Sequence, residues 1–308
     1  MPYFLAVDAG GTKTEFALAD EQRELLRVRT GAIQRQRVNE QTAQQNLDEA
    51  LSQLESLTGV AMQSVRTSCV GTSGITVPLV ADWLRHAFAA SVGGELLLIG
   101  DVEIALDACF PGARGVLVLA GTGSNIAGRS SNGTIVTAGG WGPALADQGS
   151  GHFIGREALR RGFLAIDQER QTILLDRAMQ YWKLTSRAAL IEHANTKPSP
   201  DFSALAPLVV AAAADGDPVA QEVLREGGQD LAYLASLVIQ RIRKTECAAS
   251  DGAFTPPPVA VAGSILGKVA PVREALTQSL RVTYPDLQII EAPADPITGA
   301  LWRARQGK

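Results

Sequence analysis

The chain has 308 residues, 46% of them hydrophobic, which is enough apolar material for one large or two ordinary domains. Its formal net charge of -4, with 28 scattered Lys and Arg residues, gives no basic surface for nucleic acid. No uncharged run approaches the ~18 residues that a membrane span needs, and no basic leader precedes the apolar residues 3–7. We therefore expect a cytoplasmic protein without nucleic acid or membrane partners.

The three cysteines, Cys69, Cys109 and Cys247, are widely separated and form no Cys-x-x-Cys pair. This pattern indicates neither a disulfide framework nor a structural zinc site. We expect three reduced thiols that are mostly buried. The three histidines, His86, His152 and His193, share no spacing with a metal site.

The first elements in chain order are three short strands at residues 3–8, 15–20 and 24–30. They predict a β-meander whose first turn, GGTKT, is rich in glycine. A helix follows over residues 40–57, where apolar side chains recur at helical spacing and Gly59 provides the stop.

Strands and helices then alternate along the chain. A strand at 65–71 precedes a helix that starts near Pro78, and a strand at 95–99 precedes a helix that opens near Asp101. The order βββαβαβα predicts parallel strands joined by helices, with both faces of the sheet covered.

The same pattern begins again after a turn near residue 112. Residues 116–128 form a strand, a glycine turn and a second strand, and a third strand follows at 134–140. Repetition after about 110 residues predicts two similar domains rather than a solenoid, whose repeats span ~20–50 residues. Beyond residue 150 the pattern is mainly helical, with a loop at 248–258, a strand from residue 259 and a last helix at 297–305.

Glycine-rich turns can bind anions, because backbone N–H groups converge there without side chains in the way. Both repeats contain such a turn: Gly10, Gly11, Thr12 and Lys13 in the first, and Gly121, Thr122, Gly123 and Ser124 in the second. Neither fits the P-loop or the dinucleotide fingerprint, since both lead into strands. A single turn of this kind favours a plain hairpin, whereas two of them together favour a phosphate-binding pair.

Five motifs resemble the N-acetylglucosamine kinase and BadF-type ATPase family, which belongs to the sugar kinase, heat-shock chaperone ATPase and actin superfamily. The motifs are DAGGTKTE at 8–15, AGTGSN at 120–125, GGWGPALADQGSG at 139–151, GDP at 216–218 and VAVAGS at 259–264. They follow the family's order and cover essentially the whole chain.

The resemblance implies an α/β fold of two ribonuclease-H-like (actin-like ATPase) domains with an ATP cleft between them. The first domain would comprise residues 1–113 joined by the C-terminal helix 296–306, and the second would comprise residues 114–295 with helical additions. The implied activity is ATP-dependent phosphorylation of an amino sugar of the N-acetylglucosamine, glucosamine or N-acetylmuramic acid type, at the 6-hydroxyl. ATP and Mg²⁺ would be the cofactors, and the protein would be a homodimer.

The resemblance also implies the nucleotide site. Asp8 would organise the magnesium ion, although its position in a turn also suits an aspartate that caps its own backbone. The two glycine turns, Gly10 to Lys13 and Gly121 to Ser124, would hold the phosphates from two sides. Ala213, Gly263 and Ser264 would border the adenosine.

Asp101 is the predicted general base that takes the proton of the sugar hydroxyl. It stands at the carboxyl end of strand 95–99 and opens a helix, where open parallel sheets place their ligands. A helix N-cap is the structural alternative, and the two roles are compatible.

Four residues match family positions around the sugar: Asn125, Gly139, Gly140 and Asp147. In glycine loops an isolated Asn or Asp is more often a turn residue than a ligand, so the sugar-binding roles of Asn125 and Asp147 rest mainly on the resemblance. Trp141 would shape the same wall or lie in the core.

One loop departs from the family pattern. In place of G-x-x-N-P-N the chain has GAIQRQRVN, which puts Gln34 and Arg35 where the family has its sugar-contacting asparagine and the proline after it. We hypothesise that Arg35 or Arg37 contacts a carboxylate of an acidic amino sugar, the alternative being two solvated arginines.

Two other functions stay open. An ATPase activator of a 2-hydroxyacyl-CoA dehydratase type system needs cysteine ligands for an iron-sulfur cluster, but no cysteine here lies in a recognisable cluster loop. A non-catalytic sugar sensor is the second alternative. The cysteine-rich zinc motif of the ROK sugar kinases is absent from the chain.

Overall fold

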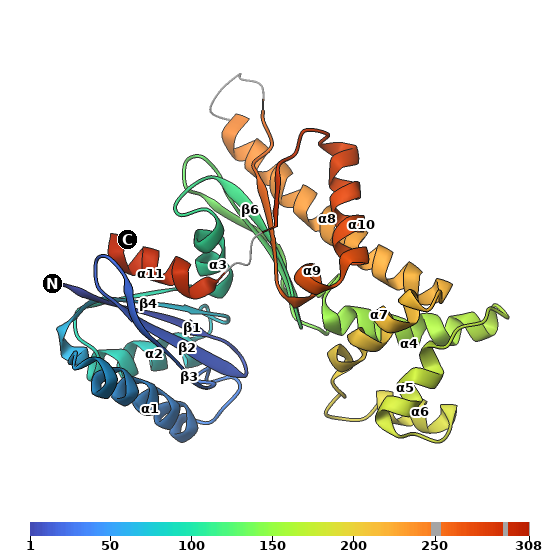
Figure 1. Cartoon of the computed structure of the whole chain (residues 1–308), viewed down its shortest axis with the longest axis horizontal. Coiled ribbons are helices and arrows are strands. Elements are labelled where there is room, and N and C mark those ends of the chain that lie inside the picture. Colours follow the sequence, from blue (N-terminus) through green and yellow to red (C-terminus); the bar gives the residue numbers. More distant parts are fainter. Residues whose placement is uncertain (248–253, 292–294, 308) are drawn as a thin grey trace. The chain divides into compact units, whose positions relative to one another are not determined.

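The computed structural model describes residues 1–247, 254–291 and 295–307. The chain divides into two compact units, Met1–Ala113 with Ala294–Lys308 and Arg114–Pro293, which are described one after the other (Figure 1).

Unit 1 is built on a five-stranded mixed sheet in the order β3-β2-β1-β4-β5. The strands are β1 (Tyr3–Ala9), β2 (Lys13–Ala19), β3 (Glu24–Gly31), β4 (Val65–Thr72) and β5 (Glu95–Gly100). The first three form the predicted antiparallel meander, while β1, β4 and β5 are parallel. The carboxyl ends of β1, β4 and β5 therefore share one edge of the sheet.

Helices cover both faces of this sheet. They are α1 (Glu40–Thr58), the short η1 (Met62–Ser64), α2 (Pro78–Ser91), α3 (Asp101–Cys109) and α11 (Pro296–Gln306). Leu5 and Val7 of β1 join the core that contains α1 and α2, whereas Phe4 and Ala6 join the core that contains α3 and α11. This alternation is the two-residue period of a strand buried on both sides.

The limits of α1 follow from its sequence. The Asn39 side chain accepts a hydrogen bond from the Thr42 N–H at 2.9 Å, and the helix ends at Gly59, whose φ is 72°. Asn39 therefore caps the first turn, and Gly59 adopts the left-handed conformation that ends many helices. The predicted helix and its stop are confirmed.

Unit 2 repeats the topology of the first sheet, in the order β10-β9-β6-β7-β8. Its strands are β6 (Gly115–Ala120), β7 (Ser124–Arg129), β8 (Ile135–Gly139), β9 (Val259–Ala262) and β10 (Ile289–Glu291). β6 pairs antiparallel with β7 and parallel with β9, as β1 does with β2 and β4. The internal repeat seen in the sequence is thus a repeat of strand order and direction.

The helices of unit 2 form most of the chain after residue 150, as predicted. They are α4 (Gly151–Asp167), α5 (Leu174–Trp182), α6 (Arg187–Ala194), η2 (Phe202–Leu205), α7 (Ala206–Ala214), α8 (Pro218–Cys247), α9 (Ser264–Lys268) and α10 (Ala270–Thr283). Sequence reasoning did not anticipate α6, α9, α10 or β10. Residues 248–253 of the predicted loop 248–258 lie outside the described residues.

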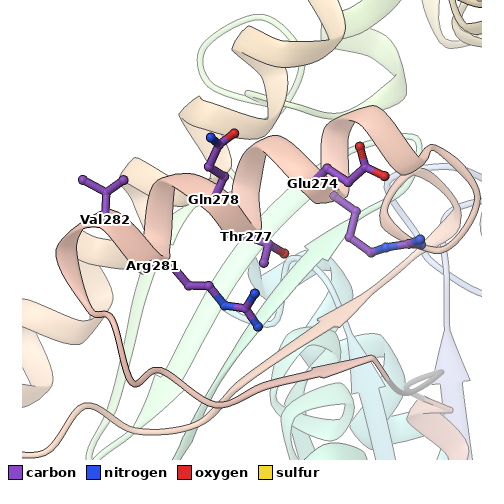
Figure 2. A pocket seen from close by; sticks show the side chains of 6 residues that line it. Glu274, Thr277, Gln278, Arg281 and Val282 are labelled. Carbon is purple, nitrogen blue, oxygen red and sulfur yellow. The ribbon is translucent and has the colours of Figure 1, made fainter.

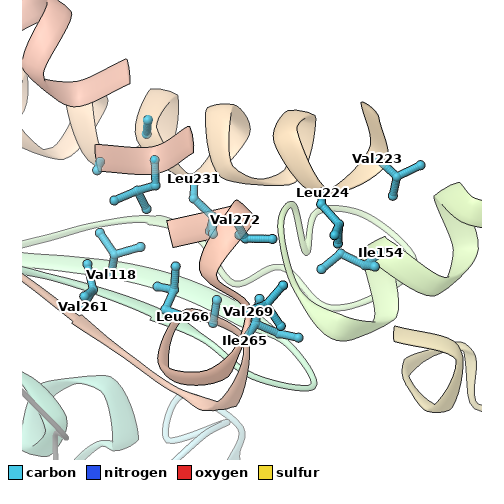
Figure 3. Close-up of a cluster of buried hydrophobic side chains, with 14 of the residues drawn as sticks. Val118, Ile154, Val223, Leu224, Leu231, Val261, Ile265, Leu266, Val269 and Val272 are labelled. Atoms are coloured by element: carbon cyan, nitrogen blue, oxygen red, sulfur yellow. The ribbon is translucent and has the colours of Figure 1, made fainter. Parts of the chain in front are cut away.

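The core of unit 2 joins its sheet to α8 and α10. Figure 3 shows Val118 and Val261 of the strands beside Leu231 of α8 and Val272 of α10. A Cβ at Gly228 of α8 would come within 2.3 Å of the Val272 carbonyl oxygen. Glycine therefore allows the two helices to pack closely, and α8 runs unbroken through this residue.

Among the described helices, none is by itself long and apolar enough to cross a membrane. The bent pair 202–214 and 218–247 meets the criteria together, by length and composition only. Both helices of this pair contribute buried residues to the core of unit 2.

Candidate functional site

The first glycine turn joins β1 to β2 at the sheet edge where β4 and β5 also end. Its base is fixed on both sides: the Thr14 hydroxyl oxygen accepts a hydrogen bond from the Ile33 N–H at 3.2 Å, and the Thr72 hydroxyl donates to the Ala9 carbonyl oxygen at 3.3 Å. Gly11, Thr12 and Lys13 are exposed above this base. The turn is therefore both a hairpin and an anchored, accessible loop.

Two carboxyl groups lie at the same edge. Burial raises the pKa of Asp8 to about 6, and the charges of Asp101 and Glu15 add to the effect. Burial also raises the pKa of Asp101, against a hydrogen bond that Asp101 Oδ1 accepts from the Val102 N–H at 2.8 Å. The strands thus bring together two of the predicted site residues, within each other's electrostatic field.

Asp101 is the first residue of α3, and the helix N-cap is Gly100. The carboxylate accepts from the adjacent N–H of its own helix instead of closing a standard capping bond to the second or third N–H. A carboxylate has more acceptor sites than this bond uses, so Asp101 can also accept from a donor outside the helix.

The acid pair fits a magnesium ion. Buried carboxyl groups that lie close together have raised pKa values and so keep their protons to a higher pH than usual. A divalent cation stabilises their charged forms. Among the described residues no group of three or more His, Cys, Asp and Glu side chains could hold a metal. Mg²⁺ commonly uses one or two carboxylates together with phosphate and water, and Asp8 would supply a carboxylate.

The divergent loop lies beside the same edge. Gln34 is 2% exposed, and its Nε2 donates to the Ser73 carbonyl oxygen at 2.9 Å and to the Ser73 hydroxyl at 2.6 Å. The Arg35 guanidinium donates to the Val38 carbonyl oxygen at 2.9 Å and to Glu40 at 3.3 Å. Both predicted sugar contacts are therefore engaged inside the fold.

In unit 2 the second glycine turn borders a cavity of about 390 Å³. Gly121 and Thr122 form one rim with Ser264, and a Cβ at Gly121 would lie 3.6 Å from the Ser264 hydroxyl. The walls are mostly apolar, and Lys268 supplies a cation. The remaining lining residues are Gly151, Ser203, Ala206, Pro207, Val210, Ile265 and Val269.

A cavity with apolar walls, a hydroxyl rim and a cation suits a purine nucleoside with its phosphates at the turn. Of the three residues predicted to border adenosine, Ser264 lines this cavity. Ala213 is buried on α7, and neither Ala213 nor Gly263 is among the residues that line the cavity. Gly263 has a φ of 96°, and a Cβ there would come within 2.3 Å of the Ala120 carbonyl oxygen, so the backbone approach requires glycine.

The predicted sugar residues gather on another part of the same turn. Asp147 Oδ1 accepts a hydrogen bond from the Ser124 N–H at 3.2 Å, and a Cβ at Gly123 would lie 3.2 Å from Asp147 Oδ2. Burial raises the pKa of Asp147, against that hydrogen bond. The turn thus has the cavity beside Gly121 and a carboxyl group beside Gly123.

Asn125 lies next to this carboxyl on β7, opposite Gly139 of β8. A Cβ at Gly140 would lie 2.6 Å from the Asn125 side chain, so glycine leaves room for the amide. Asn125 Oδ1 is buried and has no hydrogen-bond donor within residues 1–247, 254–291 and 295–307. Trp141 is 73% exposed, so the expectation that it could be a core residue is wrong.

Helix α4 fixes the second turn, a role that sequence reasoning missed. The Gly151 N–H donates to the Gly121 carbonyl oxygen at 2.7 Å, and the His152 N–H donates to the Thr122 carbonyl oxygen at 3.1 Å. The Ser150 hydroxyl caps the helix by accepting from the Phe153 N–H at 3.1 Å. The signal was present in GGWGPALADQGSG, whose final GSG is a capped helix start.

A larger cavity, of about 640 Å³, lies along α10 (Figure 2), and none of the predicted site residues lines it. Its lining comes from one helix: Arg273, Glu274, Thr277, Gln278, Arg281 and Val282.

Residues 5–304 match the family model of the BadF/BadG/BcrA/BcrD ATPase family. The chain belongs to this family. Its curated relatives include an N-acetylmuramic acid/N-acetylglucosamine kinase of Clostridium acetobutylicum, 25% identical over 315 residues, with 99% of each chain covered. They also include an N-acetyl-D-glucosamine kinase of Dictyostelium discoideum, 27% identical over 322 residues, with 99% of this chain and 98% of the relative covered.

Among solved structures, a proposed N-acetylglucosamine kinase of Chromobacterium violaceum has a TM-score of 0.72 at 24% identity, with 98% of each chain covered. A ROK family glucokinase of Streptomyces griseus, solved with glucose and AMPPNP, has a TM-score of 0.58 at 19% identity, with 99% of this chain and 100% of that chain covered. At these identities the likeness shows the fold alone, which is the mixed α/β, actin-like ATPase fold of sugar kinases. The predicted family and fold class are confirmed.

The cysteines are free, and they differ in burial. Cys69 is buried, Cys109 is half-buried and Cys247 is exposed. Burial raises the pKa of the Cys69 thiol to about 12 and that of Cys109 to about 11. These raised pKa values disfavour the thiolate, which is the reactive form, at Cys69 and Cys109.

Proposed function

We propose that this protein is an ATP-dependent kinase of an amino sugar that phosphorylates the 6-hydroxyl with Asp101 as general base. The observation that carries the proposal is the acid pair at one sheet edge, Asp8 and Asp101, beside an anchored glycine turn. The two curated relatives, named as N-acetylglucosamine and N-acetylmuramic acid kinases, support the substrate class.

In this proposal, different groups of residues bind the phosphates, the nucleoside and the sugar. Backbone N–H groups of each turn, at Gly10 to Lys13 and at Gly121 to Ser124, bind phosphate oxygens of ATP. Ser264 and the apolar cavity of α7 and α9 bind the nucleoside. Asn125 and Asp147 bind sugar hydroxyls, Asn125 through an oxygen that has no donor among the described residues.

Asp101 accepts the proton of the attacking hydroxyl. Burial raises the pKa of Asp101, which makes it a better proton acceptor than an ordinary aspartate. ATP would supply the phosphoryl group, and Mg²⁺ held at Asp8 would neutralise charge that builds up on it. Such a reaction belongs in the cytoplasm, where ATP is available, and a homodimer remains part of the proposal.

A coupled ADP-release assay tests this function. Turnover of N-acetylglucosamine, glucosamine, N-acetylmuramic acid, glucose and a no-sugar control should show at least one amino sugar well above glucose. Mass spectrometry and NMR of the product would locate the phosphate on the 6-hydroxyl. ATP turnover that is independent of every sugar would contradict the kinase proposal and favour the activator type of ATPase.

A further inference from the structure

The divergent loop places two arginines near the first glycine turn, and the structure separates their roles. Arg35 is a structural residue of the loop, because its guanidinium donates to Val38 and Glu40 and its side chain is only 13% exposed. Arg37 is exposed, and in the part of the chain that the structure describes no hydrogen bond or ion pair engages its guanidinium.

Arg37 lies against the phosphate turn itself. A Cβ built on Gly11 would lie 3.4 Å from Arg37 Nε, 3.8 Å from its Cγ and 3.9 Å from its Cδ. The stem of Arg37 thus covers the Gly11 backbone, and the absence of a side chain at Gly11 makes this contact possible. An anion at Gly11 would meet a guanidinium next to it.

The loop holds this position through its other residues. The Arg37 N–H donates to the Gln34 carbonyl oxygen at 2.9 Å, which closes a tight turn. Gln34 is buried and donates to Ser73 at the end of β4. The turn that contains Arg37 is therefore anchored to the sheet edge. This anchoring restricts the position of the Arg37 backbone.

Lys13, the cation within the turn, is drawn elsewhere. Its Nζ lies 3.6 Å from Glu15 Oε1, and Glu15 also pairs with Arg27 and Arg29. Arg37 remains as the cation over Gly11 whose donors are not engaged by another described side chain. A planar guanidinium with free donors is the group that binds a carboxylate or a phosphate in two-point geometry.

We propose that Arg37 binds an oxyanion of the reactants at Gly11, either the terminal phosphate of ATP or a carboxylate carried by the sugar. The inference rests on the proposed kinase function. It assigns the binding of the ligand's negatively charged group to Arg37. It also predicts that Arg35, the other arginine of the loop, acts only by holding the loop.

Binding measurements, which need no turnover, distinguish the two candidate groups, the terminal phosphate of ATP and a carboxylate of the sugar. Calorimetry with Arg37→Ala should compare a non-hydrolysable ATP analogue with ADP, and N-acetylmuramic acid with N-acetylglucosamine. Loss of a charged hydrogen bond should weaken one member of a pair by about tenfold to a hundredfold relative to wild type. A selective loss for the ATP analogue assigns the terminal phosphate, and a selective loss for N-acetylmuramic acid assigns the carboxylate.

Two further variants control for charge and shape. Arg85→Ala removes an exposed arginine on α2 that pairs with Asp82, and it should leave both affinity ratios unchanged. Arg37→Lys keeps the charge without the planar fork and should fall between wild type and Arg37→Ala. The proposal is overturned if folded Arg37→Ala keeps both wild-type ratios, or if Arg85→Ala changes them equally. Failure of wild type to phosphorylate any sugar would instead overturn the kinase function, and the binding ratios would still test Arg37.

Discussion

Replacing Asp8 by Asn should stabilise the ligand-free protein while removing activity. The folded-state pKa of Asp8 is about 6, against an ordinary value of 3.8. At about 1.4 kcal/mol per pH unit, this difference corresponds to about 3 kcal/mol. The Asp8 carboxyl group keeps its proton to a higher pH in the folded state than in the unfolded state. Its contribution to the free energy of unfolding is therefore fully present below pH 3.8 and is lost as the pH rises through about 6. Asn carries no charge, so Asp8→Asn avoids the loss.

The stability advantage of Asp8→Asn over wild type should therefore grow between pH 4 and 7, by up to about 3 kcal/mol. Pulsed hydrogen exchange at increasing urea, read by mass spectrometry on peptides of β1 and β4, measures the unfolding of unit 1 alone. Asp48→Asn, a change at an exposed carboxyl on α1, is the matched control. With Mg²⁺ and ATP the order should reverse, since the wild-type carboxylate then has a cation. A pH-independent difference between Asp8→Asn and wild type would refute the reasoning.

Three further outcomes test the other parts of the site. Asp101→Asn should lower kcat by about 10²- to 10⁴-fold while calorimetry shows nearly unchanged ATP binding, and near-normal turnover would remove Asp101 from the role of base. Lys268→Met should raise KM for ATP by about tenfold without changing KM for the sugar, because its ammonium group lines the cavity of unit 2 alone. Gly263→Ala should destabilise unit 2 by at least about 1–3 kcal/mol in urea unfolding, since its φ is 96° and the new Cβ meets the Ala120 backbone. The control Gly267→Ala, where a Cβ would meet no atom within 4 Å, should have little effect.

The parts of the fold that the sequence predicts are those whose signals are local. Alternating apolar residues and glycine turns identify both meanders, and Asn39 and Gly59 mark the ends of α1. β10 has only three residues and, among the described strands, pairs with β9, so its assignment depends on a partner distant in sequence. The sequence signal is weak there because strand preference depends on the neighbouring strand.

The residues of the site divide in the same way. Asp8 lies near the carboxyl end of β1 and Asp101 directly follows β5, so the parallel sheet predicts that they share an edge. Ala213 was predicted from a helix, α7, that has apolar residues all round and therefore no pattern that fixes which face meets the cavity. The structure puts Pro207 and Val210 of this helix on the cavity instead. The choice between Arg35 and Arg37 depends on a turn in which the N–H groups of Arg37 and Val38 both donate to the Gln34 carbonyl oxygen, and no periodicity encodes this turn.

The two repeats pair their first two strands in the same way, but the paired side chains next to the glycine turn differ. Ala9 pairs with Thr14 and Ala120 with Ser124, and one step back Asp8 pairs with Glu15 whereas Leu119 pairs with Asn125. Facing acids repel each other, so the first copy favours a cation. The second copy has no such charge, and its buried Asn125 oxygen lacks a donor among the described residues, so it favours a hydroxyl. The same strand-turn-strand pattern thus presents different groups in the two copies, because two side chains per copy decide whether it holds facing acids or a buried amide oxygen without a donor among the described residues.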